Sequence, residues 1–132
     1  MPRERRLAPL AGGLLGDSGS DFVIVEWSDA GQSGWEWIAP LHVHYADDEA
    51  WYVLEGSLRF RLGEETVRAG PGAAVFAPKG TAHSYGNARE GELVRYLLVM
   101  TPRIRALVEA LHAPGAGDYA EIFRAHESEL LS

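Results

Sequence analysis

Short stretches of alternating apolar and polar residues fill the chain between residues 21 and 101. In residues 57–62, for example, Leu58 and Phe60 alternate with Arg59 and Arg61. Such alternation is typical of a half-buried strand, because successive side chains of a strand point to opposite faces. Glycine, proline and aspartate separate the stretches and predict turns. We expect short strands at about 22–28, 34–43, 50–54, 57–62, 65–68, 74–77, 82–86 and 93–100.

The period changes to that of a helix near the C-terminus. Four apolar residues recur at the i, i+3, i+4, i+7 spacing of one helical face: Ile104, Leu107, Val108 and Leu111. The glycine- and proline-rich segment 113–117 ends this helix, and Asp118 is a suitable N-cap for a second one. The apolar face that we expect for the second helix comprises Tyr119, Ile122, Phe123, His126 and Leu130.

These patterns predict an all-β fold with a short C-terminal helical extension. Many short strands joined by glycine turns indicate a sandwich or a barrel. We divide the chain into an N-terminal arm at 1–20 with a possible edge strand, a barrel at 21–102, and a helical tail at 103–132 packed on the barrel. A chain of 132 residues is long enough for one domain with a real core.

Composition narrows the classes of partner. The net charge of −7 argues against binding to nucleic acid or to an anionic membrane surface. The chain has no cysteine, which excludes disulfides and thiolate ligands and leaves cytoplasm as the default compartment. Proline and glycine interrupt the apolar stretch 7–15, so a signal peptide is not expected, and no apolar run approaches the roughly 20 residues that span a bilayer.

Three histidines and a carboxylate near the middle of the chain are candidate metal ligands. His42 and His44 share one face of a predicted strand, about 7 Å apart along it. Glu49 follows a short polar turn, and His83 follows a turn that contains Pro78 and Gly80. Imidazole and carboxylate groups together suit a divalent transition metal, so we predict one metal site made of His42, His44, Glu49 and His83.

The spacing of these residues resembles the two sequence motifs of the cupin superfamily. The first motif is matched at His42, His44, Glu49 and Gly56, and the second at Gly72, Pro78, Gly80, His83 and Asn87. One departure is Glu36, which stands where the first motif opens with glycine; Gly34 lies two residues earlier. The resemblance is to small, single-domain cupins of the quercetin dioxygenase type. It implies a jelly-roll barrel, also called a double-stranded β-helix, followed by a helical tail.

The resemblance also implies a function. We expect a metal-dependent, dioxygenase-like oxidoreductase that acts on a small, aromatic or diketone substrate and uses iron, manganese, nickel, copper or zinc. Glu49 would be a ligand that can also act as a base. Two alternatives stay open: a non-catalytic small-molecule binding or sensor protein, and a zinc-type isomerase, epimerase or lyase. A homodimer is expected, in which the N-terminal arm and the following strand at 22–25 pair with the other subunit.

Aromatic and apolar residues near the ligands are candidates for a substrate pocket. Trp51 and Val53 have the same strand parity as Glu49, and Tyr85 has that of His83. The complete set of predicted pocket residues is Trp37, Trp51, Val53, Phe76, Tyr85 and Tyr96. An ordinary core role is the alternative for each, since small barrels are filled by such side chains. His112 and His126 lie in the predicted tail, where surface or packing roles are expected.

Overall fold

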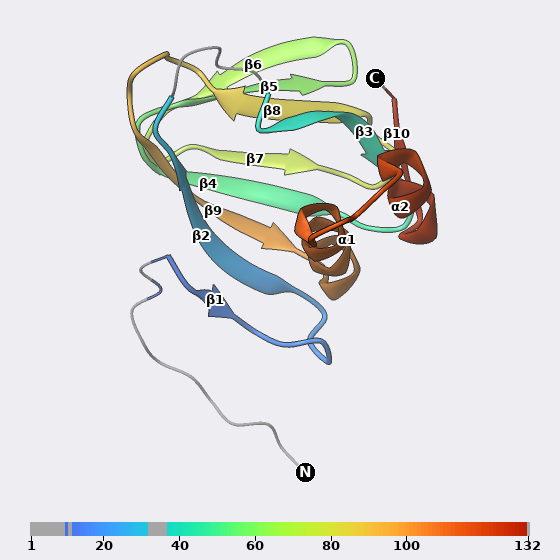
Figure 1. Ribbon diagram of the computed structural model, residues 1–132. Coiled ribbons are helices and arrows are strands. Elements are labelled where there is room, and N and C mark those ends of the chain that lie inside the picture. Colours follow the sequence, from blue (N-terminus) through green and yellow to red (C-terminus); the bar gives the residue numbers. More distant parts are fainter. Residues whose placement is uncertain (1–9, 11, 32–36, 132) are drawn as a thin grey trace.

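The computed structural model describes residues 10, 12–31 and 37–131, and it confirms an all-β fold with short C-terminal helices. Two five-stranded sheets face each other, and both helices lie at one end of them (Figure 1). Every pairing between neighbouring strands is antiparallel. No helix in the described part of the chain is long and apolar enough to cross a membrane.

The first sheet contains strands from both halves of the chain. Its order is β1-β2-β9-β4-β7. The strands are β1 (Leu14–Leu15), β2 (Val23–Asp29), β9 (Val94–Met100), β4 (Glu49–Glu55) and β7 (Ala74–Ala77). Both edges of β2 are occupied, by β1 and by β9, so residues 23–25 pair within their own chain. Most of the N-terminal arm, for which pairing with another subunit is expected, lies outside the described residues.

The second sheet has the order β10-β3-β8-β5-β6. Its strands are β10 (Ser128–Leu130), β3 (Ala39–His44), β8 (His83–Asn87), β5 (Leu58–Leu62) and β6 (Glu65–Ala69). The side chains that alternate inward from the two sheets form one shared core, which includes Trp51, Val53, Leu58, Phe60 and Leu98.

Local sequence explains both helices at the barrel end. Helix α1 (Pro102–His112) begins with a proline in its first turn, and the Thr101 side chain accepts a hydrogen bond from the backbone of Ile104. Helix α2 (Tyr119–Ala125) is capped by Asp118, as the sequence predicts, because its carboxylate accepts hydrogen bonds from the first turn. Ile104, Leu107 and Phe123 turn inward and are buried.

The predicted extension of the second helix to Leu130 is wrong. Helix α2 ends at Ala125, and Glu127 adopts a left-handed conformation with φ of 56°. This conformation turns the chain so that β10 pairs with β3, in register from Ser128 opposite His44 to Leu130 opposite His42. The last strand therefore lies directly beside two of the predicted ligands.

Candidate metal centre

The fold brings all four predicted ligands together. One possible ligand atom from each of His42, His44, Glu49 and His83 lies within 4.8 Å of the others, and all four side chains are buried. The two neighbouring histidines come from β3, Glu49 is the first residue of β4, and His83 is the first residue of β8. The cluster therefore joins both sheets at the end of the barrel that the helices cover (Figure 1).

An irregularity in β3 positions the first histidine. Ala39 lies opposite Tyr85 and His42 lies opposite His83, so β3 contains one more residue than β8 over this interval. Such a bulge tolerates Pro40, which has no N–H group for the strand ladder. The carbonyl oxygen of Pro40 lies 2.6 Å from Nδ1 of His42 and orients its ring.

Two turns hold Glu49 beside His83. The Asp48 carboxylate accepts a hydrogen bond of 2.8 Å from the backbone N–H of Lys79. The backbone N–H of Gly80 donates to the carbonyl oxygen of His44, also at 2.8 Å. These bonds fasten the polar turn before Glu49 to the proline–glycine turn before His83, so the two turns bring together ligands 34 residues apart.

Backbone carbonyl groups fix the protonation of two ligands. Nδ1 of His42 faces the Pro40 oxygen, and Nδ1 of His83 faces the Thr81 oxygen at 2.9 Å. A carbonyl oxygen only accepts, so each Nδ1 carries the proton and each neutral ring has its lone pair on Nε2. Both Nε2 atoms point into the cluster, as ligand atoms would.

Ser128 fixes the third ring in the same way, a role that has no local signal in the sequence. The Ser128 hydroxyl donates to the carbonyl oxygen of His126 at 3.0 Å, which uses its only proton. Its oxygen therefore accepts from Nδ1 of His44, at 2.7 Å. The lone pair of His44 is then also on Nε2, which lies 3.2 Å from Nε2 of His42.

Electrostatics within the cluster favour a neutral His42 beside an ionised Glu49. Burial, together with the neighbouring His83 and His44, lowers the pKa of His42 to about 4. Burial alone would raise the pKa of Glu49, but the close approach of His44 and His83 outweighs it and holds the pKa at about 2. Glu49 Oε1 lies 3.3 Å from Nε2 of His44 and 3.1 Å from Nε2 of His83.

The donor set fits a divalent transition metal ion. With every Nδ1 satisfied, three imidazole lone pairs and one carboxylate converge in a buried space. Lone pairs that face each other repel unless a cation lies between them, and neutral imidazole with ionised carboxylate is the set that zinc, iron, manganese, nickel and copper accept. His42, His44, Glu49 and His83 would hold the ion, and the same set serves each of these metals.

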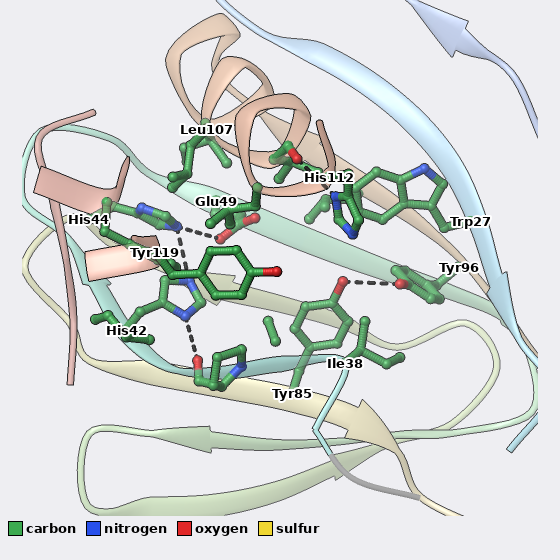
Figure 2. A pocket seen from close by; sticks show the side chains of 18 of the residues that line it. Trp27, Ile38, His42, His44, Glu49, Tyr85, Tyr96, Leu107, His112 and Tyr119 are labelled. Atoms are coloured by element: carbon green, nitrogen blue, oxygen red, sulfur yellow. Dashed lines mark hydrogen bonds and ion pairs between the residues drawn. The ribbon is translucent and has the colours of Figure 1, made fainter. Parts of the chain in front are cut away.

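A cavity of about 600 Å³ opens beside this cluster (Figure 2). His42, His44 and Glu49 form part of its wall, together with residues of both helices. Most of the remaining wall is apolar, including Trp27, Leu98, Ile104, Leu107, Phe123 and Leu130. A concave apolar site with a few convergent polar groups is the usual form of a small-molecule site.

Two of the six predicted pocket residues, Tyr85 and Tyr96, line this cavity. Trp51 and Val53 do point inward, as their parity predicts, but they are 1% and 0% exposed and belong to the packed core. Trp51 supports the site from behind, because its ring contacts that of His83 with centroids 5.6 Å apart. Trp51 and Val53 therefore have the alternative role, that of core residues.

The remaining two predicted pocket residues lie outside the cavity. Phe76 is 58% exposed, because β7 pairs Ala77 with Glu49 and so directs Ala77 inward and Phe76 outward. Trp37 is 38% exposed and lies under the guanidinium group of Arg59, 4.1 Å from the ring centroid. Strand β7 reads Ala-Val-Phe-Ala, and four apolar residues in a row give no parity signal.

The structure adds wall residues that are not among the predicted pocket residues. Trp27 from β2, Leu107 from α1 and Tyr119 from α2 all line the cavity, and so does His112. His112 is at the end of α1, where its Nδ1 donates to the Val108 carbonyl oxygen at 2.8 Å. The amphipathic patterns of these elements were visible in the sequence, but they did not indicate that the helices cover the barrel mouth.

Ser128→Ala is expected to weaken metal binding about 10- to 100-fold, the usual effect of removing a hydrogen bond to a ligand. Without the hydroxyl, no described contact of His44 holds the proton on its Nδ1. Ser84→Ala is the matched control, because Ser84 is equally buried but adjoins His83 on the opposite face of β8. Metal affinity is measured by competition with a chromophoric chelator. Equal affinities of the two variants would contradict the role of Ser128.

Comparisons with known proteins agree with this geometry. The cupin domain family Cupin_2 matches residues 34–100, about half of the chain. An uncharacterized protein of Streptomyces coelicolor is 33% identical over 58 residues, which cover 44% of this chain and 53% of that protein. The chain thus matches about half the length of this curated relative.

Solved structures show the same fold. An uncharacterized conserved protein with a double-stranded β-helix domain from Klebsiella pneumoniae superposes with a TM-score of 0.57 at 22% identity, over 75% of this chain and 91% of that one. The polyketide cyclase RemF from Streptomyces resistomycificus is 33% identical, with a TM-score of 0.51 over 64% of this chain and 57% of that one. The family match, the double-stranded β-helix and the buried histidine–glutamate cluster agree, and the chain belongs to the cupin superfamily.

Proposed function

We propose that this cupin is a metal-dependent enzyme with dioxygenase-like activity towards a small, apolar substrate that carries oxygen atoms. The observation that carries the proposal is the apolar cavity of about 600 Å³ that ends on His42, His44 and Glu49. A substrate that enters this cavity reaches the candidate metal centre directly. Cavities of this size and polarity suit molecules of one or a few rings.

Each part of the site has a role in this proposal. Bound iron, manganese, nickel or copper would supply redox chemistry with dioxygen, whereas bound zinc would supply Lewis acidity. The apolar walls from both helices bind the hydrocarbon part of the substrate and exclude water. Glu49 holds its negative charge at the cluster, and its low pKa favours the role of ligand over that of general base.

The composition of the cavity wall limits the substrate class. No lysine or arginine is among the described residues that line it, so a phosphate group would find neither of these side chains as a partner there. This argues against a phosphorylated sugar as substrate. Aromatic compounds and diketones match an apolar wall with a metal at one end.

A second candidate is a non-redox reaction of the same substrate class. The observation that favours it is the 33% identity with the polyketide cyclase RemF, since that protein carries a cyclase name within the same fold. In this case the centre would act as a Lewis acid on a carbonyl oxygen. The aromatic and carbonyl-bearing nature of the substrate would be unchanged.

Metal content and oxygen uptake together test the proposal. We expect near-stoichiometric iron, manganese, nickel or copper in the purified protein by mass spectrometry. We also expect oxygen uptake with acetylacetone or with an aromatic hydroxyketone, lost on chelation and recovered on reloading. Near-stoichiometric zinc without oxygen uptake would instead favour the second candidate. Absence of bound metal even after reloading would contradict both enzyme hypotheses and leave a non-catalytic binding protein.

We also propose a homodimer in the cytoplasm with no nucleic-acid or membrane partner, as the sequence predicts. The exposed aromatic side chains of Tyr52 and Phe76 support self-association, because they lie on the outer face of the first sheet. The strand β1 of the N-terminal arm pairs with β2 of its own chain, so a second copy would contact this outer face or residues outside the described ones.

A further inference from the structure

The cavity has a second polar end, formed by Tyr85 and Tyr96. Tyr85 comes from β8 and Tyr96 from β9, so the pair joins the two sheets across the barrel. Their hydroxyl oxygens lie 3.0 Å apart, and both side chains are buried although they line the cavity. Figure 2 shows this pair at the opposite end of the cavity from His42, His44 and Glu49.

One hydroxyl proton of the tyrosine pair is not used within the pair and can be donated to a ligand. Two hydroxyl groups carry two protons, and the bond between them uses one. Among the described residues, no acceptor is bonded to the other proton. The Trp51 indole packs against the Tyr85 ring, with centroids 5.3 Å apart, and its buried N–H group is a further donor beside the pair. The end of the cavity near Tyr85 is therefore rich in donors and poor in acceptors.

Both tyrosine side chains are buried, and burial raises the pKa of Tyr96, which keeps its hydroxyl group in the donor form. A buried donor without an acceptor costs free energy, and a ligand oxygen placed between the tyrosines and the cavity would remove that cost.

The distance between the two polar ends of the cavity matches the length of a ligand with one or two fused rings. His83 and Tyr85 are two residues apart on β8 and share its inner face, which places them about 7 Å apart along the strand. The wall beside the tyrosines is apolar and includes Trp27, Ile38 and Leu98. A ligand that uses both ends therefore carries oxygen atoms on opposite edges of a flat apolar body.

We propose that the Tyr85–Tyr96 pair is a second anchoring site, which donates a hydrogen bond to a carbonyl or phenolic oxygen of the ligand while its opposite edge faces the metal ligands. The ligand class is that of hydroxyquinones and polyhydroxylated aromatic ketones. The metal-facing half of this inference rests on the proposed function. The tyrosine half stands on the hydrogen-bond geometry alone.

Two probes and two variants test the pair. Lawsone is a hydroxynaphthoquinone with adjacent hydroxyl and carbonyl groups on one edge and a further carbonyl group opposite. Hydroxynaphthaldehyde with adjacent hydroxyl and aldehyde groups has two fused rings and a chelating edge of its own but lacks the opposite oxygen. Binding of both is measured by titration calorimetry to the wild type, to Tyr85→Phe/Tyr96→Phe and to the control Tyr52→Phe, whose hydroxyl is outside the cavity. Each protein is used zinc-loaded and metal-free.

We expect the double variant to bind lawsone about tenfold more weakly than the wild type, and to bind hydroxynaphthaldehyde equally well. The double variant removes both partners of the bond, so its melting temperature should stay near that of the wild type. The difference should persist in metal-free protein, so a failure of metal loading would overturn the proposed function without affecting this comparison. Equal loss for both probes, no loss for lawsone, or no binding of lawsone by the wild type would each overturn the second anchoring site.

Discussion

His83→Ala is expected to lower metal affinity by at least about a hundredfold. Structural sites of four ligands have apparent binding free energies of about 10–16 kcal/mol, which is about 3 kcal/mol for each ligand, and 1.4 kcal/mol is a factor of ten. His83 is also the ligand that closes the centre across the barrel, because it lies next to His42 in register and next to Glu49 in space. Metal content after dialysis against a weak chelator measures the loss.

His112→Ala is the matched control for this experiment. His112 also lines the cavity, but it belongs to α1 and lies outside the cluster of ligand atoms. We expect this variant to keep its metal. Glu49→Gln should lose affinity without a change in side-chain size, since the amide has no charge to offset that of the cation. Retention of metal by His83→Ala, or equal loss in His112→Ala, would contradict the assigned centre.

The candidate ligands could be predicted because local spacing determines most of their placement. His42 and His44 alternate with Val43 on one strand, and the alternation alone puts both rings on one face. The turns before Glu49 and His83 are visible as polar and proline–glycine segments. That the turns lock together through Asp48 and Lys79 was not visible, because a contact across 31 residues has no local signal.

The end of the chain was predicted less well, for a physical reason. A helix usually stops where glycine can take the left-handed conformation, but here Glu127 takes it. The sequence therefore contains no glycine signal for the end of α2, and the helical period appeared to continue to Leu130. Only the docking of β10 on β3 shows that Ser128 reaches His44. The pocket residues were also predicted less well, because the outer wall of the cavity comes from helices whose position depends on tertiary packing.

Gly56→Ala is expected to lower the free energy of unfolding by about 2–5 kcal/mol, a large part of the stability of a typical domain. Gly56 follows β4 with φ of 73°, where a residue with a side chain costs about 1–2 kcal/mol. A Cβ atom there would also collide with the Leu93 carbonyl oxygen and lie 2.9 Å from Cα of Val94. Relief of such an overlap requires backbone shifts that cost about 1–3 kcal/mol more.

Gly63→Ala separates the cost of the left-handed conformation from the cost of the steric overlap. Gly63 has a similar φ of 58°, but a Cβ atom there meets nothing within 4 Å, so we expect a loss of only about 1–2 kcal/mol. Urea unfolding of both variants measures the difference. Equal losses would mean that conformation alone explains Gly56, whereas the larger loss would show that the motif glycine is needed where the turn after β4 packs on the start of β9. Strand β4 begins with Glu49 and pairs with β9, so this close packing also supports the strand that supplies the carboxylate.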